Sequence, residues 1–287
     1  MGVRFLTPNA AVDELIAAGS TVGVGGMHMS AAPMSLVREI VRQRVSVGRL
    51  ITSPSASMQA DLLIGAGLVD EIISPYVGFE HLGLAPCFRR AAESQELVIS
   101  ECDEGSLTHA LYAGAGGIPF LACPPGIDLT DIPEVNPDFY RRTVDPFTGQ
   151  QCWAIAGLRP DVALLACSEA DEEGNVAFGR FPFTDRLMAL AARNLVVQVE
   201  KVVPASELAR RAPGETLPAF LVSAVVVIAG GCHPAGSPGH YARDEDAIAS
   251  YLQAARKPSS FSAWLDEVVL SGDEEAYVAA AHAGSES

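Results

Sequence analysis

Short apolar runs alternate along most of the chain with stretches in which apolar residues recur every three or four positions. The first pattern predicts buried strands and the second predicts amphipathic helices. Strands are expected at residues 21–24, 49–52, 71–74, 97–100, 120–121, 152–156, 162–167, 195–199 and 221–228. Helices are expected at residues 12–16, 34–41, 58–66, 107–115, 185–193 and 244–255, with two more around Trp264 and Tyr277. This alternation predicts an α/β fold with an open, mostly parallel sheet flanked by helices.

The chain is expected to form one domain, residues 1–287, with two lobes, because no linker or change of composition divides it. Residues 124–147 are rich in Pro, Asp and Gly without periodicity, which predicts a long functional loop. Residues 281–287 are expected to fray. The longest apolar run, residues 220–229, is interrupted by Ser223 and is too short to span a bilayer, so it predicts a buried strand.

The net charge of the chain excludes some classes of binding partner. The chain has 19 Lys and Arg against 35 Asp and Glu, a formal net charge of −16, which argues against nucleic acid and against anionic membranes as partners. Its six cysteines form no CxxC pair, and its His residues form no HxH or HxxxH pair. We therefore expect reduced thiols, a cytoplasmic location and no metal site.

The first candidate site is the segment from Gly23 to Ser30, between a predicted strand and a predicted helix. Gly25 and Gly26 permit close backbone approach, and the following helix offers N–H groups to an anion or a carbonyl oxygen. The dinucleotide fingerprint GxGxxG is broken by His28, so a nicotinamide cofactor is weakly supported. A tight turn without a ligand is an equally good interpretation.

The second candidate is the segment Glu101-Cys102-Asp103-Glu104-Gly105, at the carboxyl end of a predicted strand, where α/β folds bind ligands. Crowded carboxylates there suit general acid or base chemistry. The alternative, that Asp103 or Glu104 caps the next helix, is the better supported of the two.

Two loops are weaker candidates. Residues 230–236 contain Cys232 and His233 after the most apolar strand, but a lone His does not indicate a metal site. The acidic loop 170–175 is typical of a solvated turn with Gly174 or Asn175 at positive φ. The chain contains neither a GxSxG elbow nor a P-loop.

Taken in order, five segments of the chain resemble the α subunit of the class I CoA-transferases, of the glutaconate CoA-transferase type. These segments are residues 22–26, 100–105, 117–121, 171–175, and 231–234 followed by 243–245. The resemblance implies the class I CoA-transferase fold, coenzyme A as part of an acyl-CoA substrate, and a β subunit, in an αβ heterodimer or an α2β2 heterotetramer. It also implies that the attacking glutamate belongs to the β subunit, so that this chain is inactive alone.

What the resemblance implies for individual residues is substrate positioning. Gly25 and Gly26 would lie near the thioester, and Met27, His28 and Ser30 would shape the pocket. Glu104 and Glu101 are the candidate catalytic residues: positioning groups in a transferase, or a general acid or base in a hydrolase or a lyase.

Two relatives of the transferases with other chemistry also match. The segment from Glu101 to Gly105 resembles that of a steroid ring-opening CoA hydrolase, and residues 144–149 and 160–165 resemble a methylglutaconyl-CoA decarboxylase. The chain departs from the transferases and the hydrolase after Leu121, where an expected arginine is missing, so the acyl group is expected to be smaller or less acidic. A distant alternative is a non-catalytic domain that senses a phosphosugar.

Cations for the coenzyme are scarce. Arg38, Arg42, Arg44 and Arg49 cluster beside the predicted helix that follows the glycine turn, but at helical spacing a solvated face is an equally good interpretation. The resemblance and the net charge together predict that the partner holds most of the CoA nucleotide.

Overall fold

A ten-stranded sheet forms the body of the chain, and the computed structural model describes it within residues 3–285. Eight of its strands run in the order β1-β13-β11-β9-β2-β3-β4-β5, and each neighbouring pair is parallel. The short strands β10 and β12 add antiparallel pairs beyond β9. The strands are β1 Arg4–Phe5, β2 Ser20–Val24, β3 Val47–Thr52, β4 Val69–Ser74, β5 Val98–Glu101, β9 Val162–Asp171, β10 Val176–Ala177, β11 Asn194–Val203, β12 Thr216–Leu217 and β13 Ala224–Val227.

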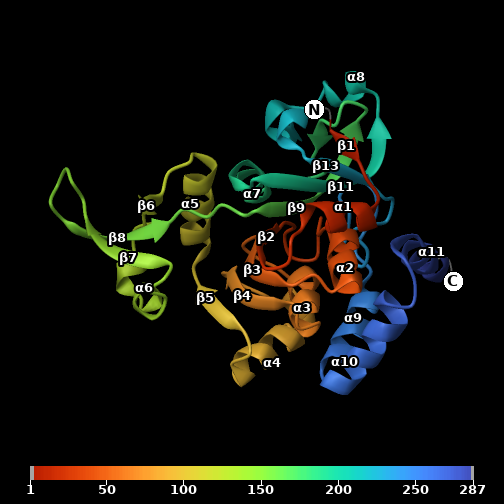
Figure 1. The fold of residues 1–287 in the computed structure, drawn as a ribbon, viewed down its shortest axis with the longest axis horizontal. Coiled ribbons are helices and arrows are strands. Elements are labelled where there is room, and N and C mark those ends of the chain that lie inside the picture. The colour runs from red at the N-terminus through yellow and green to blue at the C-terminus, as the bar shows by residue number, and fades with distance from the viewer. Residues whose placement is uncertain (1–2, 286–287) are drawn as a thin grey trace.

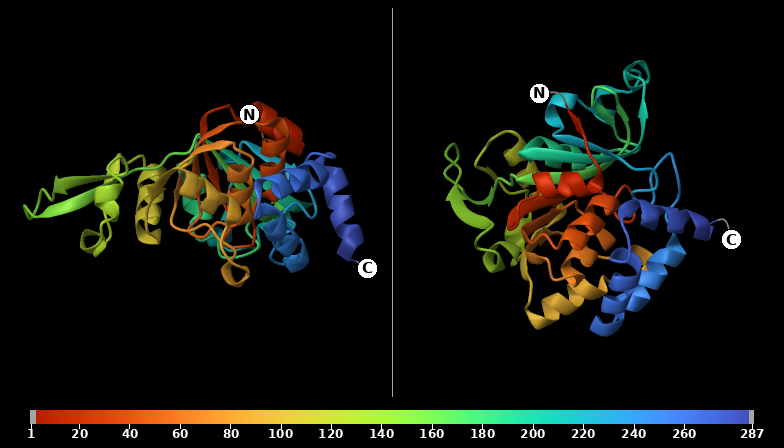
Figure 2. Two further views of the ribbon diagram at one scale, coloured as in Figure 1. Left: turned by 90° about the horizontal axis from the view of Figure 1, so that it is seen from below. Right: turned by 45° about the vertical axis from the view of Figure 1, so that its right-hand side comes forward.

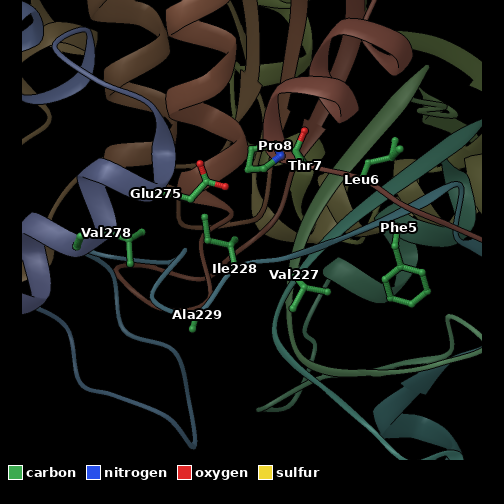
Figure 3. Close-up of a pocket in the computed structure, with 10 residues that line it drawn as sticks. Phe5, Leu6, Thr7, Pro8, Val227, Ile228, Ala229, Glu275 and Val278 are labelled. Atoms are coloured by element: carbon green, nitrogen blue, oxygen red, sulfur yellow. The ribbon is translucent and has the colours of Figure 1, made fainter.

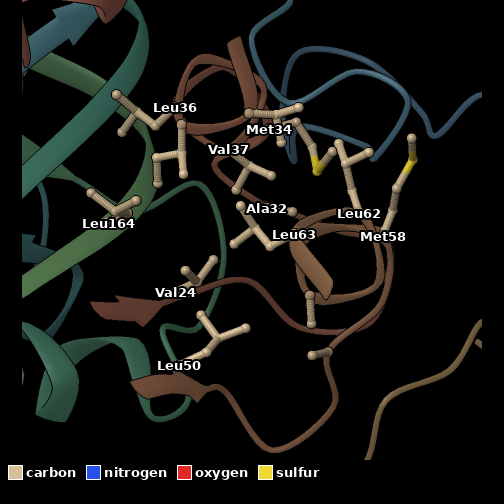
Figure 4. Close-up of a cluster of buried hydrophobic side chains, with 14 of the residues drawn as sticks. Val24, Ala32, Met34, Leu36, Val37, Leu50, Met58, Leu62, Leu63 and Leu164 are labelled. Atoms are coloured by element: carbon tan, nitrogen blue, oxygen red, sulfur yellow. The ribbon is translucent and has the colours of Figure 1, made fainter. Parts of the chain in front are cut away.

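Helices cover both faces of this sheet, because successive residues of its strands point in opposite directions. Leu50 and Leu164 belong to one buried cluster, and their neighbours Ile51 and Leu165 belong to another. Figure 4 shows the first cluster, with side chains of the sheet packed against α2 and α3. The helices on the face of the first cluster are α1 Pro8–Leu15, α2 Met34–Gln43, α3 Met58–Gly65, α4 Pro86–Ser94, α9 Glu245–Ala255 and α10 Pro258–Trp264. The face of the second cluster carries α5 Glu104–Ala115 and α7 Asp185–Ala191.

A second, antiparallel sheet in the order β6-β8-β7 projects from the body beyond α5 (Figures 1 and 2). Its strands are β6 Phe120–Ala122, β7 Tyr140–Val144 and β8 Gln151–Ala156. The segment 124–147, expected to be a loop, contains the 3₁₀ turn Ile127–Leu129, the short helix α6 Ile132–Val135 and β7, so that expectation was wrong. Its Pro-rich composition hid a strand whose register is set by pairing with β8.

The C-terminal region also differs from expectation. Helix α10 continues through the π-helical turn Leu265–Val269, and α11 covers Glu274–Ser285, so residues 281–285 are helical rather than frayed. Residues 286 and 287 of the predicted tail lie outside the described residues. The strand expected at residues 221–228 is shorter, because β13 covers only Ala224–Val227. The start of the apolar run forms the 3₁₀ turn Ala219–Leu221 instead, in which Phe220 is 86% exposed. The short helix α8 is Ala205–Leu208, and within residues 3–285 no helix combines the length and hydropathy needed to cross a bilayer.

Candidate functional site

The connection after β2 lies at the point where the order of the strands reverses direction. From β2 the chain proceeds to β3, β4 and β5 on one side, whereas β9, β11 and β13 lie on the other. Open α/β sheets bind ligands outside the carboxyl ends of their strands at such a reversal. The glycine turn of the first candidate segment therefore occupies the position in this fold that is best suited to a ligand.

Close packing explains both glycines of this turn. A Cβ atom at Gly25 would lie 2.4 Å from Leu165 Cδ2 and 2.9 Å from Asp185 Oδ1. Gly26 has φ +96°, and a Cβ atom there would lie 2.8 Å from Ala32 Cα. Any side chain at either position would displace its neighbours or strain the backbone.

A buried carboxylate holds the glycine turn in place through hydrogen bonds. Asp185, at the start of α7, is fully buried and accepts hydrogen bonds from Gly26 N–H at 3.2 Å, Ser53 Oγ at 2.6 Å and Arg180 Nη2 at 2.7 Å. The three donors come from loops far apart in the sequence. Asp185 therefore joins the ends of β2 and β3 to the segment that precedes α7.

The backbone N–H groups of the turn are already used inside the chain. Gly25 N–H donates to Leu164 O at 2.9 Å, Gly26 N–H to Asp185, and Ser35 N–H at the start of α2 to Gly231 O at 2.9 Å. Met27 and Ser30 exchange two backbone hydrogen bonds of 3.0 and 3.1 Å. These N–H groups therefore have partners inside the chain, and an anion at the turn would have to be bound by the N–H groups of other residues.

Two of the sequence candidates meet here. Ala31 N–H donates to Gly236 O at 2.8 Å, and Gly236 N–H donates to Met29 O at 3.0 Å, so the loop 230–236 braces the turn. The glycines and Met29 are buried, which leaves Met27, His28 and Ser30 as its partly exposed side chains.

Backbone strain gathers at the same place. Six residues other than glycine have positive φ among the described residues, and two of them, Arg44 and Gln95, end helices α2 and α4. Of the other four, His28 and Ala31 follow β2, Glu80 begins the 3₁₀ turn Glu80–Leu82 after β4, and Phe183 precedes α7. Left-handed conformations at such residues cost of order 1–3 kcal/mol each and cluster at functional sites.

The second candidate segment lies apart from the turn. Glu101 ends β5 at the edge of the sheet, and β5 is three strands from β2, roughly 14 Å at the usual strand spacing. Asp103 caps α5 by accepting hydrogen bonds from Ser106 N–H at 3.0 Å and Ser106 Oγ at 2.6 Å, which confirms the cap interpretation. Glu101 and Glu104 are exposed at the same edge of the sheet.

Two of the four arginines beside the glycine turn, Arg38 and Arg42, are covered by the rest of the chain, whereas Arg44 and Arg49 are exposed. Arg38 is 1% exposed; it forms an ion pair with Glu274 of α11 and donates to His233 O at 2.6 Å, while its guanidinium stacks on Tyr277. Arg42 also pairs with Glu274, at 2.7 Å. The solvated face therefore describes Arg44 and Arg49 but not Arg38 and Arg42, because Glu274 of α11 pairs with those two.

His233, the third candidate, is engaged in the same region. Its Nδ1 lies 2.9 Å from Tyr277 Oη and its Nε2 lies 3.1 Å from Asp244 Oδ2. No group of three or more His, Cys, Asp or Glu side chains within residues 3–285 is arranged to hold a metal ion. The acidic loop turns at Gly174 with φ +90°, as expected.

A cavity of about 650 Å³ lies at the lateral edge of the sheet that β1 and β13 form, against α1 and α11 (Figure 3). Among the residues that line it, Glu275 is the only ionisable one; Phe5, Ile228 and Val278 are apolar.

Sequence reasoning missed Ser53, Glu80, Arg180 and Asp185 as parts of the site. Asp185 was expected only as the start of a helix, and its contact with Gly26 joins positions 159 residues apart. A pattern of neighbouring residues in the sequence does not predict a contact between positions so far apart.

Known proteins resemble this chain over most of its length. A family model described as coenzyme A transferase matches residues 5–227. A 3-oxoadipate CoA-transferase subunit from Pseudomonas knackmussii is 32% identical over 93% of this chain and 93% of its own length. The cholesterol ring-cleaving hydrolase IpdA subunit of Rhodococcus jostii is 31% identical over 94% of this chain and 93% of its own length.

Solved structures give the same picture. Glutaconate coenzyme A-transferase from Acidaminococcus fermentans superposes with a TM-score of 0.87 at 25% identity, covering 96% of this chain and 92% of the other. A variant of the decarboxylase AibA/AibB superposes with a TM-score of 0.81 at 30% identity, covering 92% of this chain and 99% of the other. The predicted fold, an open and mostly parallel sheet flanked by helices, is confirmed.

Proposed function

The chain belongs to the coenzyme A transferase family, and on that premise we propose that it is the α-type subunit of a heteromeric enzyme that moves CoA from an acyl-CoA thioester to a carboxylic acid. The partner subunit carries the glutamate that attacks the thioester. Two relatives, from the 3-oxoadipate and the glutaconate CoA-transferases, are named as single subunits of their enzymes, which supports a partner for this chain too.

The observation that carries the proposal is the glycine turn at the reversal of strand order. Gly25 and Gly26 let the turn pack closely against Leu165 and Ala32, and Asp185 fixes the turn by accepting a hydrogen bond from Gly26 N–H. Met27, His28 and Ser30 supply the partly exposed side chains that would contact the acyl group. Preorganised contacts of this kind accelerate reactions by positioning.

The partner subunit is expected to supply the hydrogen-bond donors and cations that this chain does not offer at the turn. The N–H groups of Gly25, Gly26 and Met27 are donated internally, so the partner supplies donors that stabilise a developing oxyanion. Arg38 and Arg42 are committed to Glu274, so the partner also supplies most cations for the CoA nucleotide. The net charge of −16 fits that arrangement.

Glu101 and Glu104 are proposed as positioning groups further along the same edge. They are exposed and belong to β5 and the first turn of α5, roughly 14 Å from the glycine turn. An extended acyl-CoA that lies along the carboxyl edge would pass both places.

A ring-opening or thioester hydrolase is the second candidate. The segment from Glu101 to Gly105 favours it, because both glutamates are exposed while Asp103 serves as the helix cap. One of the two would then act on water as a general base. A relative named as a cholesterol ring-cleaving hydrolase subunit supports the same alternative.

The experiment is an exchange assay on the complex formed with the partner subunit. We expect radiolabelled acetate or succinate to enter the acyl-CoA pool only when both chains are present. Loss of substrate that depends on water, without exchange into any acid, would replace transfer by hydrolysis. Glu104→Ala separates the two roles, because losing a general base removes turnover whereas losing a positioning group raises KM.

A further inference from the structure

The last helix of the chain is fastened to the helix that follows the glycine turn. Glu274, in the first turn of α11, accepts hydrogen bonds from Arg38 Nε at 3.0 Å and from Arg42 Nη1 at 2.7 Å, and both arginines belong to α2. Glu274 is 2% exposed and Arg38 is 1% exposed. The start of α11 is therefore fixed against α2 by a buried ion pair.

The next residue on the same face of α11 contacts the loop 230–236. Tyr277 follows Glu274 by three positions, which places both side chains on one side of the helix. Tyr277 Oη lies 2.9 Å from His233 Nδ1, and the Arg38 guanidinium carbon lies 3.7 Å from the centre of the tyrosine ring. Arg38 Nη1 also donates to His233 O at 2.6 Å. Helices α2 and α11 therefore hold the backbone and the ring of His233 together.

A third helix contacts His233 from its other side. His233 Nε2 lies 3.1 Å from Asp244 Oδ2, and the other carboxylate oxygen of Asp244 caps α9 by accepting from Ala247 N–H at 2.9 Å. Asp244 N–H donates to Pro234 O at 2.9 Å. The position of His233 is thus set by α2, α9 and α11, which meet at this one side chain.

The loop held in this way supports the strained part of the glycine turn. Ala31 has φ +51°, a left-handed conformation that persists in residues other than glycine only where the surroundings impose it. Ala31 N–H donates to Gly236 O at 2.8 Å, and Gly236 N–H donates to Met29 O at 3.0 Å. Ser35 N–H, at the start of α2, donates to Gly231 O at 2.9 Å. A shift of the loop would therefore release the backbone of the turn on both sides of its strained residue.

We propose that Tyr277 is a positioning residue that acts through His233: it fixes the loop 230–236, and the loop holds the strained glycine turn. The family model matches residues 5–227, so the loop and α11 both lie outside the matched part of the chain. The coupling of α11 to the turn is a property of this chain alone, whereas its effect on turnover rests on the proposed function.

The first test is residue-resolved amide hydrogen exchange in the full chain. Tyr277→Phe keeps the ring on Arg38 and removes only the hydroxyl that contacts His233. One neutral hydrogen bond corresponds to about a two- to twelvefold change in an equilibrium constant, so the amides of Ala31 and Gly236 should exchange faster by up to that factor, and those of β11 should change less. The matched control is Tyr112→Phe, whose side chain on α5 is 58% exposed and which should leave both amides unchanged. Faster exchange confined to α11 would overturn the proposal, because the loop would then not depend on the helix.

A double-mutant cycle tests the route through His233. His233→Ala should by itself speed exchange at Ala31 and Gly236, and adding Tyr277→Phe should change the rates no further, because the partner of the hydroxyl is already gone. Additive effects of the two substitutions would mean that Tyr277 acts by another route and would overturn the proposal.

The third test is the kinetics of the complex with the partner subunit. Tyr277→Phe should raise KM for the acyl-CoA, by at most about twelvefold, and leave kcat unchanged, because saturating substrate selects the ordered turn. An unchanged KM would overturn the assignment of Tyr277 as a positioning residue, and a fall in kcat alone is what loss of folded chain produces. A complex that turns over no acyl-CoA would refute the proposed function and leave the exchange result standing.

Discussion

Replacing Asp185 tests whether one buried carboxylate holds the glycine turn in place. Its side chain is 1% exposed and that of its partner Arg180 is 13% exposed, so removing the carboxylate leaves a largely buried guanidinium without its counter-charge. Breaking a buried pair in this way costs about 3–5 kcal/mol. Asp185→Ala should lower the free energy of unfolding by that amount, and Asp185→Asn, which keeps the shape, by about 1–3 kcal/mol.

Urea unfolding measures this effect, with the midpoint and the slope fitted separately. An unchanged slope shows that stability, and not the extent of unfolding, has changed. The matched control is Asp138→Ala, whose carboxylate is 96% exposed and 3.4 Å from Arg141, and which should change stability by less than about 0.5 kcal/mol. A cost below about 1 kcal/mol for Asp185→Ala would refute the argument that this carboxylate organises the turn.

Three further predictions concern buried groups and the turn. Burial raises the pKa of Asp61 from 3.8 to about 6, so the folded state binds a proton at this carboxyl more tightly than the unfolded state does. The protonated carboxyl therefore contributes about 3 kcal/mol of stability near pH 4, and this contribution is lost as the pH rises through about 6. Thermal or urea unfolding at pH 4 and pH 8 should show that difference in the native chain and not in Asp61→Asn; equal slopes with pH would contradict it. Arg38→Ala should lower the free energy of unfolding by about 1–3 kcal/mol, because Glu274 stays buried but keeps Arg42 as a partner, and a near-neutral effect in urea unfolding would mean that α11 is not docked there. Gly26→Ala should lower kcat/KM of the complex at least about tenfold while the partner still binds; full activity would exclude the turn from the site.

The strands and helices of the sheet were predictable because each depends on local periodicity. Leu164 and Leu165 belong to an apolar run that is typical of a buried parallel strand, and in residues 34–41 of α2 apolar residues recur every three or four positions. The amphipathic helix α4, which is polar on average, was missed. So were the very short strands β1, β10 and β12, which exist only through pairing.

The candidate site was predictable in part. Gly25 and Gly26 were found because only glycine fits a close backbone approach, and that requirement leaves a local signature. The contacts that give the turn its properties are distant in sequence: Asp185 reaches Gly26, and Glu80 reaches His28. The same holds for Arg38, whose partner Glu274 lies 236 residues away. Sequence periodicity reports which face of a helix is apolar, but it does not report that a later helix will cover a charged one.

The most direct test of the central claim is the intact mass of each polypeptide once the complex has been incubated with an acyl-CoA and quenched. The account predicts a covalent CoA or acyl adduct on the partner, and this chain at its unmodified mass, with no turnover when either chain is omitted. An adduct on this chain, or turnover by this chain alone, would contradict it.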